Sequence, residues 1–215
     1  MAPGLASGTE VLDELLVAQP LEAVRGKLTE DPDSIKPIKS TKLIENSFRV
    51  SRMTQTDELL QNNEAYAASF DKGDLPPPPG RKLAVLACMD ARLDPARELG
   101  LEEGDAHVIR NAGGVVTDDA LRSLSISQNL LGTEEIVLIH HTDCGMLTFT
   151  DDEFAQRLEQ ETGSRPEWRG HAFTDLEQDV RDGIERIKQS PFVPRTDKVR
   201  GFVYEVETGR LREVG

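Results

Sequence analysis

The sequence predicts an α/β fold with a mainly parallel central sheet, strand order 2-1-3-4, flanked by helices. From residue 82 onward, apolar runs of strand length alternate with helical segments, which is typical of a parallel sheet covered on both faces. The first run, 82–88, is apolar almost throughout, as a strand buried on both faces must be. An N-terminal helical arm and a C-terminal hairpin complete the predicted fold.

The N-terminal quarter differs in composition from the rest of the chain. Residues 1–52 mix Pro, Gly and charged residues with only short apolar groupings, so we expect an extension that is poorly ordered or partly helical. One short amphipathic helix around 9–18 fits the pattern. Met53 opens a segment that resembles a natural chain start, and residues 53–215 are predicted to form one domain.

A helix is predicted over 56–70, with Thr56 as its N-cap and its apolar residues mostly on one face. It ends before the Asp71-Lys72-Gly73 segment, and the prolines at 76–79 form a stiff, extended connector. This helix is therefore held away from the sheet region that follows it in the chain.

The remaining helices are predicted from their capping residues. Asp94 with Pro95 begins a short helix that ends at Gly100, and Asp118 or Asp119 begins one that runs through Leu131. Thr150 and Thr174 each precede a glutamate by three residues, which is the pattern of a capping box. The second box opens a helix with a clear apolar stripe. The predicted strands are 82–88, 106–110, 135–141, 199–206 and 211–214.

Composition excludes several kinds of partner. The net charge of −14 argues against nucleic acid and anionic membranes, because both bind clustered Lys and Arg. Lys/Arg and Asp/Glu nearly balance in 1–52, so the negative charge belongs to the domain. No run of about 18 apolar residues and no secretion signal occurs, so we expect a cytoplasmic protein without a membrane partner.

The two cysteines are the strongest chemical signal. Cys88 ends the first strand, and His141 and Cys144 lie at the end of the third. If the strand order is 2-1-3-4, these strands are neighbours and their carboxyl ends bring the three side chains together. Two thiolates and one imidazole suit zinc, and three protein ligands leave a fourth position open, as in catalytic sites.

Spacing alone leaves further roles open for the two cysteines. Both are compatible with buried apolar thiols, since free Cys behaves as a small hydrophobe. A disulfide fits poorly with the absence of a signal peptide, and a thiol redox pair would have Cys-x-x-Cys spacing. His140 precedes His141 on a strand, so its side chain points to the opposite face, and we expect it to be packed or hydrogen-bonded rather than a ligand.

Asp90 and Arg92 follow Cys88 at intervals of two residues. Arg92 can hold Asp90 in a forked, charge-assisted hydrogen bond beside the metal. The carboxylate would then either fill the vacant coordination position or orient a zinc-bound hydroxide. The plainer interpretation is an ordinary exposed ion pair, which would contribute about 0–1 kcal/mol.

Three motifs together resemble those of the β-class carbonic anhydrases, most closely the short bacterial members. They are Cys88-Met-Asp-Ala-Arg92, Val108-Ile-Arg-Asn-Ala-Gly-Gly114 and His140-His-Thr-Asp-Cys-Gly145. The resemblance extends from about Met53 to the end of the chain. It implies that Cys88, His141 and Cys144 bind one zinc per chain, that Asp90 and Arg92 form the catalytic pair, and that Asn111, Ala112 and Gly113 shape the substrate pocket.

The resemblance implies a carbonate dehydratase, a zinc lyase that reversibly hydrates carbon dioxide to bicarbonate and a proton by means of zinc-bound hydroxide. It also implies that Asp90 swings onto zinc at lower pH, and that the chain forms a homodimer or a dimer of dimers. Hydrolysis of carbonyl sulfide or carbon disulfide at the same site is the first alternative, and a non-enzymatic zinc module is the second. His107 is a candidate proton relay only because histidine titrates near neutrality, and the plainer interpretation is a strand-end histidine with no such role.

Overall fold

The computed structural model describes residues 53–215. The chain separates into two units, residues 1–67 and 68–215, and each is described by itself. The predicted extension 1–52, with its helix around 9–18, lies outside the described residues. Within the described part, no helix is long and apolar enough to cross a membrane.

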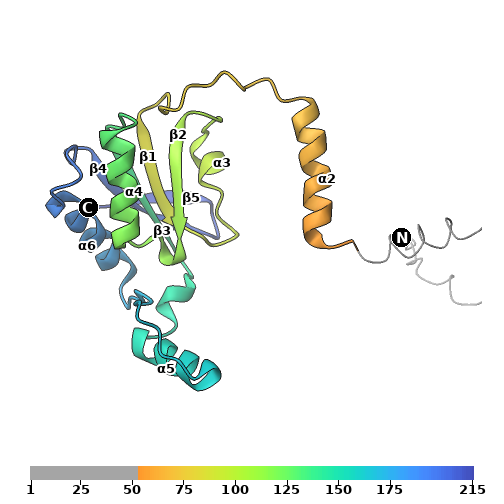
Figure 1. The fold of residues 1–215 in the computed structure, drawn as a ribbon. Coiled ribbons are helices and arrows are strands. Elements are labelled where there is room, and N and C mark those ends of the chain that lie inside the picture. Colours follow the sequence, from red (N-terminus) through yellow and green to blue (C-terminus); the bar gives the residue numbers. More distant parts are fainter. Residues whose placement is uncertain (1–52) are drawn as a thin grey trace, which may run out of the picture. The chain divides into compact units, whose positions relative to one another are not determined.

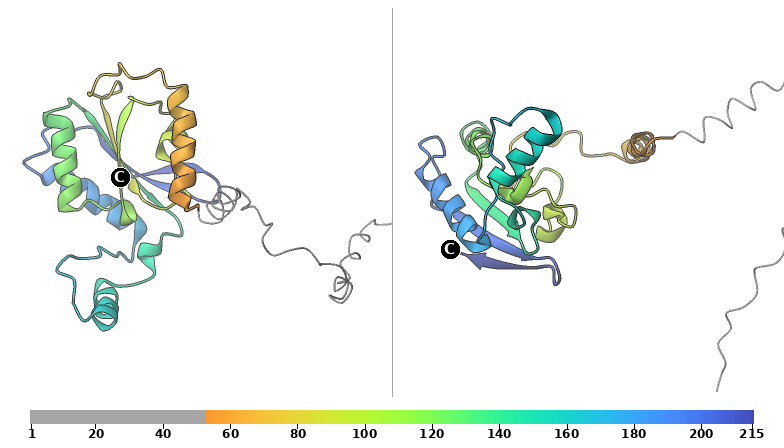
Figure 2. Two further views of the ribbon diagram at one scale, coloured as in Figure 1. Left: turned by 45° about the vertical axis from the view of Figure 1, so that its right-hand side comes forward. Right: turned by 90° about the horizontal axis from the view of Figure 1, so that it is seen from below.

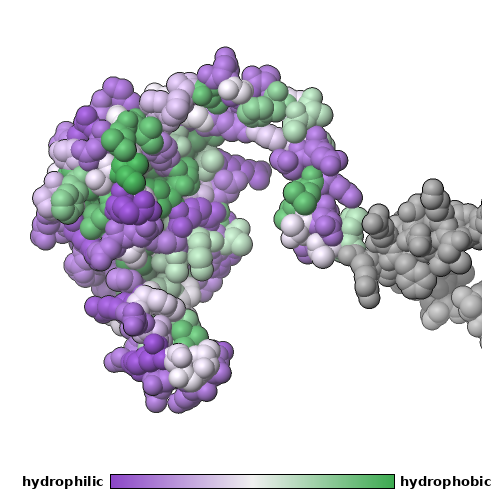
Figure 3. All heavy atoms as spheres, in the orientation of Figure 1, coloured by the Kyte–Doolittle hydropathy of each residue, from purple (hydrophilic) through white to green (hydrophobic). Residues whose placement is uncertain are grey.

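The first unit contributes the helix α2 (Gln55–Ala68). The predicted helix is present, but its cap is Thr54 and not Thr56: the Thr54 hydroxyl accepts a hydrogen bond from the Asp57 amide at 3.2 Å, and the Asp57 carboxylate accepts one from the Thr54 amide at 2.9 Å. This reciprocal pair closes the first turn two residues earlier than predicted. Leu59 and Leu60 are exposed, and Figure 3 shows hydrophobic residues on the surface of this helix.

The second unit is built on a five-stranded sheet of order β2-β1-β3-β4-β5 (Figure 1). The first four strands are parallel and β5 pairs antiparallel with β4, so the predicted order and the C-terminal hairpin are confirmed. The strands are β1 (Leu83–Cys88), β2 (Ala106–Asn111), β3 (Glu135–His141), β4 (Val199–Glu205) and β5 (Arg210–Val214).

Helices cover both faces of the sheet, as the continuous apolar strands predicted. The helices α4 (Asp118–Asn129) and α6 (Leu176–Gln189) lie on one face, where Leu86, Leu124 and Leu138 are fully buried, while α3 (Pro95–Leu99) lies on the other (Figure 1). The helix α5 (Asp151–Thr162) lies beyond the carboxyl ends of the strands, as Figure 1 and the left view of Figure 2 show. Two 3-10 turns complete the unit, η2 (Ala112–Gly114) and η3 (Gly145–Leu147).

Two further helix starts, besides that of α2, differ from the predictions. Thr117, and neither aspartate, caps α4 by accepting the Ala120 amide, and this helix ends at Asn129 rather than at Leu131. Asp175 caps α6 by accepting the Gln178 amide at 3.0 Å, so the predicted box of Thr174 with Glu177 does not form. Glu177 instead forms ion pairs with Arg181 and Arg212. The capping box at Thr150 is confirmed.

Candidate metal centre

The structure brings the three candidate ligands together. The ligand atoms of Cys88, His141 and Cys144 lie within 4.8 Å of one another, and all three side chains are buried. Cys88 ends β1, His141 ends the neighbouring strand β3, and Cys144 follows three residues later. Both cysteines are free thiols, so they do not form the disulfide that the sequence analysis considered as an alternative. The strand-end argument therefore predicted the cluster correctly.

His141 is held in the form that suits a metal ligand. Its Nδ1 lies 2.8 Å from the carbonyl oxygen of Thr142, to which it donates. The proton is thereby fixed on Nδ1, which leaves Nε2 with a free lone pair. The Nε2 atom is buried and has no hydrogen-bond partner among the described residues. A buried nitrogen without a partner, facing two sulfurs, is what a zinc ligand looks like in the absence of its metal.

The thiols are electrostatically coupled. A hydrogen bond from Cys144 lowers the pKa of Cys88 despite its burial, and the neighbouring His141 side chain and hydrogen bonds from the amides of Asp90 and Gly113 act in the same direction. The same bond to Cys88, together with burial, raises the pKa of Cys144. Burial is the largest single effect on the pKa of His141 and lowers it, but the neighbouring Cys88 and Asp90 side chains and the Thr142 carbonyl together outweigh burial, so the net shift is upward. These contacts therefore favour the thiolate form of Cys88, which is the form that binds a metal.

Gly114 lets the chain pass close behind the cluster. Its φ is +70°, and a Cβ atom there would lie 2.8 Å from both the Cys88 amide nitrogen and the Ile139 carbonyl oxygen. These are backbone atoms of β1 and β3, which cannot move aside. A glycine is therefore required at this position, both for its conformation and for the close approach of the chain.

Asp90 lies beside the cluster and is gripped by Arg92. Arg92 donates from Nε to Oδ1 at 3.0 Å and from Nη2 to Oδ2 at 2.9 Å, and its amide donates to Oδ1 at 2.9 Å. These bonds hold the pKa of Asp90 well below its usual range. The Oδ2 atom lies 3.7 Å from His141 Nε2, so the carboxylate borders the position that a metal would occupy.

Two further side chains hold the same loops, and no sequence motif pointed to either role. Arg92 also donates from Nη1 to the Asp143 carboxylate at 2.7 Å and from Nη2 to the Asp143 carbonyl at 3.0 Å. Arg110, on β2, donates to the Cys88 carbonyl oxygen from Nε at 3.0 Å and from Nη2 at 2.8 Å, and to the Asp90 carbonyl oxygen at 2.6 Å. Both contacts join segments that are distant in sequence, which residue spacing does not reveal.

The other two histidines considered as site residues lie outside the cluster. His140 points to the opposite face from His141, as predicted, and its Nε2 lies 2.7 Å from the Asp179 carboxylate on α6. His107 pairs in register with Ala84, near the amino ends of the strands, and its Nδ1 lies 2.7 Å from the Ser127 hydroxyl. It therefore lies at the opposite ends of the strands from the cluster, in agreement with the interpretation of a strand-end histidine that is not a proton relay.

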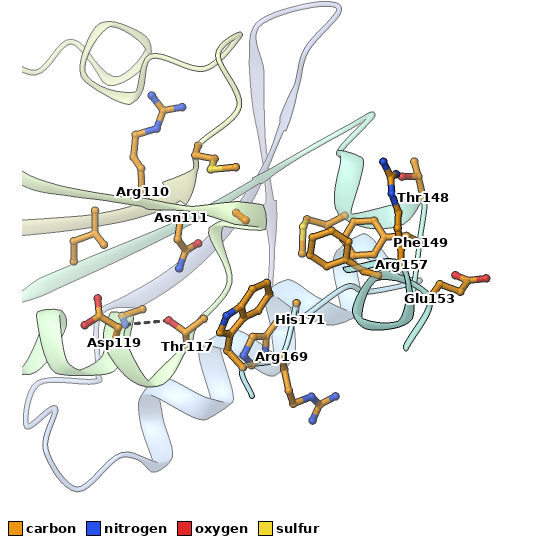
Figure 4. A pocket seen from close by; sticks show the side chains of 18 residues that line it. Arg110, Asn111, Thr117, Asp119, Thr148, Phe149, Glu153, Arg157, Arg169 and His171 are labelled. Carbon is orange, nitrogen blue, oxygen red and sulfur yellow. Dashed lines mark hydrogen bonds between the residues drawn. The ribbon is translucent and has the colours of Figure 1, made fainter. Parts of the chain in front are cut away.

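A groove of about 860 Å³ adjoins the site. Of the three predicted pocket residues, Asn111 and Ala112 line it, whereas Gly113 is buried and donates its amide to Cys88. Figure 4 shows Arg110 and Asn111 on one side of the groove, with Phe149 and Arg157 across from them. The aromatic residues Phe149, Phe154 and Trp168 form a chain of ring contacts in its far wall.

Three buried metal donors and an arginine-held carboxylate at the ends of parallel strands define a candidate metal-dependent enzyme site, and the carbonic anhydrase family model matches residues 83–171. The β-carbonic anhydrase 1 of Mycobacterium tuberculosis is 59% identical over 162 residues, which are 75% of this chain and 99% of that protein. The chain therefore belongs to the β-carbonic anhydrase family, as the three motifs predicted.

Solved structures of relatives share the fold, and some relatives are named as carbon disulfide hydrolases. The carbonic anhydrase of Streptococcus mutans superimposes with a TM-score of 0.72 at 45% identity, covering 76% of this chain and 99% of that one. The carbon disulfide hydrolase of Acidianus sp. is 38% identical over 183 residues, 73% of this chain and 87% of that protein. An apo carbon disulfide hydrolase structure has a TM-score of 0.56 at 37% identity, covering 74% of this chain and 90% of that one.

Proposed function

We propose that this protein is a zinc-dependent carbonate dehydratase that interconverts carbon dioxide and bicarbonate. The observation that carries the proposal is the 59% identity over nearly the whole of a β-carbonic anhydrase, combined with the convergence of Cys88, His141 and Cys144. The unpartnered Nε2 of His141 supports a bound metal, because burying a polar atom without a partner is unfavourable.

One zinc per chain would be held by the sulfurs of Cys88 and Cys144 and by His141 Nε2. When bound, zinc supplies the Lewis-acid chemistry that ionises water near neutral pH. The Thr142 carbonyl keeps the His141 ring in the required tautomer, and Arg110 and Gly114 fix the backbone on which Cys88 sits. This chain's own residues thus hold all three donors in place before a metal arrives.

Asp90 is the residue placed to orient the reacting water. Its Oδ2 faces the cluster, and its negative charge is maintained by Arg92, so it accepts a hydrogen bond and does not donate one. An accepted hydrogen bond directs the oxygen lone pair of the water toward the carbon of the substrate. Apolar side chains surround the cluster, among them Val115, Met146 and Phe173, and they suit an uncharged linear molecule.

Zinc content per chain, measured together with stopped-flow carbon dioxide hydration, tests this function. We expect about one zinc per chain and activity that rises from pH 6 to pH 9, with equal rates for the full chain and for one starting at Met53 if residues 1–52 form a separate extension. A flat pH profile would contradict the proposed exchange of Asp90 between zinc and Arg92. Zinc without turnover at any pH would favour a non-enzymatic module in which Asp90 permanently closes the site.

Carbon disulfide or carbonyl sulfide hydrolysis is the second candidate, because relatives at 38% identity are carbon disulfide hydrolases. All three substrates are linear molecules attacked at carbon, so the donor set does not separate them. Hydration of carbon dioxide should be faster than hydrolysis of either sulfur compound under the same conditions. The reverse order would establish the second candidate.

We propose that the protein acts in the cytoplasm as a homodimer, or as a dimer of dimers. None of the residues of α2 is buried, and Leu59 and Leu60 are 65% and 60% exposed. An apolar helix surface of this kind is suited to lying across a partner subunit. Size-exclusion chromatography should give a species of at least twice the chain mass, and a single-chain mass would contradict the dimer.

A further inference from the structure

We propose that Asp143 is a positioning residue that holds the Arg92 guanidinium beside Asp90, so that Arg92 in turn holds the Asp90 carboxylate next to the metal centre. The inference rests on the proposed function, in which Asp90 orients the reacting water. It assigns a role to a residue that does not touch the reacting atoms itself. Its basis is the geometry of one arginine shared between two loops.

Arg92 joins the loops that follow β1 and β3. One edge of its guanidinium forms the fork with Asp90, and the remaining Nη1 donates to the Asp143 carboxylate at 2.7 Å. Its Nη2 also reaches the Asp143 carbonyl oxygen at 3.0 Å. Within residues 53–215, Arg92 forms ion pairs with two side chains, Asp90 and Asp143. If Asp90 moves away, Asp143 is the group that keeps Arg92 in position.

The backbone of Asp143 is shaped for this contact. Its φ of +54° lies in the left-handed region, which residues other than glycine seldom occupy and which Asp and Asn tolerate best. In this conformation both its carboxylate and its carbonyl oxygen face the same guanidinium. The residue also lies between the candidate ligands His141 and Cys144, so Arg92 ties the Asp90 loop directly to the loop that carries them.

Most of the Asp143 carboxylate is in water, since its side chain is 78% exposed. An ion pair at such a site stabilises the fold only slightly, because water screens the two charges. Its effect on folding is therefore small. What the contact restricts is the set of positions open to the Arg92 side chain, which is 46% exposed and has Asp90 as its other ion-pair partner.

The first test measures the order of Arg92 directly in the zinc-loaded chain. Hydrogen exchange of the Arg92 side-chain Nε–H is followed by ¹⁵N NMR and assigned by its loss in Arg92→Ala. Asp143→Gly keeps the left-handed backbone and the carbonyl but removes the carboxylate, and we expect several-fold faster exchange. Asp143→Asn keeps a neutral hydrogen-bond acceptor, so its exchange rate should lie between those of the wild type and Asp143→Gly. Glu207→Gln is the matched control, because it removes a carboxylate from the same surface pocket.

The second test is a double-mutant cycle on kcat for carbon dioxide hydration. Asp143→Gly should lower kcat about fivefold with little change in KM, the factor that corresponds to an exposed pair of about 1 kcal/mol. In an Arg92→Ala background it should lower kcat no further, because it acts only through Arg92. Zinc content should stay at the wild-type level in all variants.

Equal losses of kcat in the two backgrounds would overturn the proposal, and so would unchanged Nε–H exchange in Asp143→Gly. A wild-type chain that fails to hydrate carbon dioxide would overturn the proposed function instead, while the NMR measurement would still report whether Asp143 orders Arg92. The failures of the two proposals are therefore distinguishable.

Discussion

The parallel strands begin at one end of the sheet, called here the amino edge, and finish at the other, the carboxyl edge. Each of these two edges carries a polar cluster, and the clusters differ in one respect. At the amino edge, His107 Nδ1 lies 2.7 Å from the Ser127 hydroxyl, which lies 2.7 Å from the Thr133 hydroxyl. At the carboxyl edge, His141 satisfies Nδ1 on the Thr142 carbonyl but leaves Nε2 without a partner among the described residues, facing two thiols. The polar groups of the first cluster are hydrogen-bonded to one another, whereas the second cluster keeps a nitrogen lone pair that is available to a metal.

This difference distinguishes a polar network that stabilises the fold from a cluster that can bind a metal. Buried polar groups that satisfy one another contribute to stability and specify one packing arrangement. A buried nitrogen left without a partner is unfavourable in the metal-free chain, and a bound metal recovers that energy. The same residue type therefore has different roles at the two edges, and substitutions made at both edges test the distinction.

The largest expected effect is that of His141→Gln, and the same substitution at His107 is its matched control. His141→Gln removes a metal donor, so zinc content should fall to a trace and the hydration rate by at least about 10³-fold, because water is then no longer ionised near neutral pH. His107→Gln should leave both quantities within about twofold of wild type. Zinc analysis and stopped-flow rates measure both outcomes. Equal losses in the two variants would contradict the comparison between the edges.

Glycines at the two edges give the next largest effect. Gly114→Ala places a Cβ atom 2.8 Å from backbone atoms of β1 and β3 and also strains a φ of +70°, so we expect a loss of about 2–4 kcal/mol in the free energy of unfolding. Gly132, before β3 at the amino edge, has a φ of +74° with nothing within 4 Å of a Cβ atom. Gly132→Ala isolates the conformational cost, about 1 kcal/mol. Urea unfolding compares the two, and equal losses would show that close approach is unimportant.

The carboxyl-edge cluster was predictable because two regularities act together. Apolar runs fix where parallel strands end, and parallel strands in neighbouring positions bring their ends to one edge. Cys88 and His141 are terminal residues of such strands, so their meeting follows from strand order alone. The face of His140 followed equally simply from strand alternation.

The groups that hold the cluster were not predictable in the same way. Asp143 and Arg110 act through side chains whose reach and rotamers spacing does not specify, and their contacts cross between loops. The caps of three helices were misplaced by one or two residues because Thr54, Thr117 and Asp175 each compete with a neighbour of similar capping strength. Long side chains and competing caps are decided by packing, which the sequence pattern does not contain.

A smaller effect should follow from Ser127→Ala at the amino edge. Ser127 and Thr133 are both buried, so the change leaves the Thr133 hydroxyl without this partner, and we expect a loss of about 1–3 kcal/mol in the free energy of unfolding. The hydration rate should not change, because this network lies at the opposite edge from the metal centre. Ser123→Ala, half-buried on the same helix, is the control and should be nearly neutral. A reduced rate in Ser127→Ala would show that the two edges are coupled.

The smallest expected effect is the loss of stability on acidification, compared between one carboxylate at each edge, Asp90 and Glu134. Hydrogen bonds from Arg92 lower the pKa of Asp90, and a hydrogen bond from Lys82 lowers that of Glu134 at the amino edge. A carboxyl group whose pKa is lowered by folding stabilises the fold above its unfolded pKa, about 3.9 for Asp and 4.3 for Glu, and this contribution is lost as the pH falls. Between about pH 5 and pH 3, the wild type should therefore lose more unfolding free energy than either Asp90→Asn or Glu134→Gln.

The difference from wild type should be larger for Asp90→Asn, because the Asp90 side chain is 20% exposed and held by a two-pronged fork, whereas the Glu134 side chain is 41% exposed and has a single lysine. Urea unfolding of the metal-free chain, kept so by a chelator, measures the slope at each pH without interference from zinc release. If Asp90→Asn and the wild type lose stability in parallel on acidification, the fork with Arg92 does not hold Asp90 in solution. The geometry of the carboxyl edge would then have to be maintained by the metal rather than by the chain.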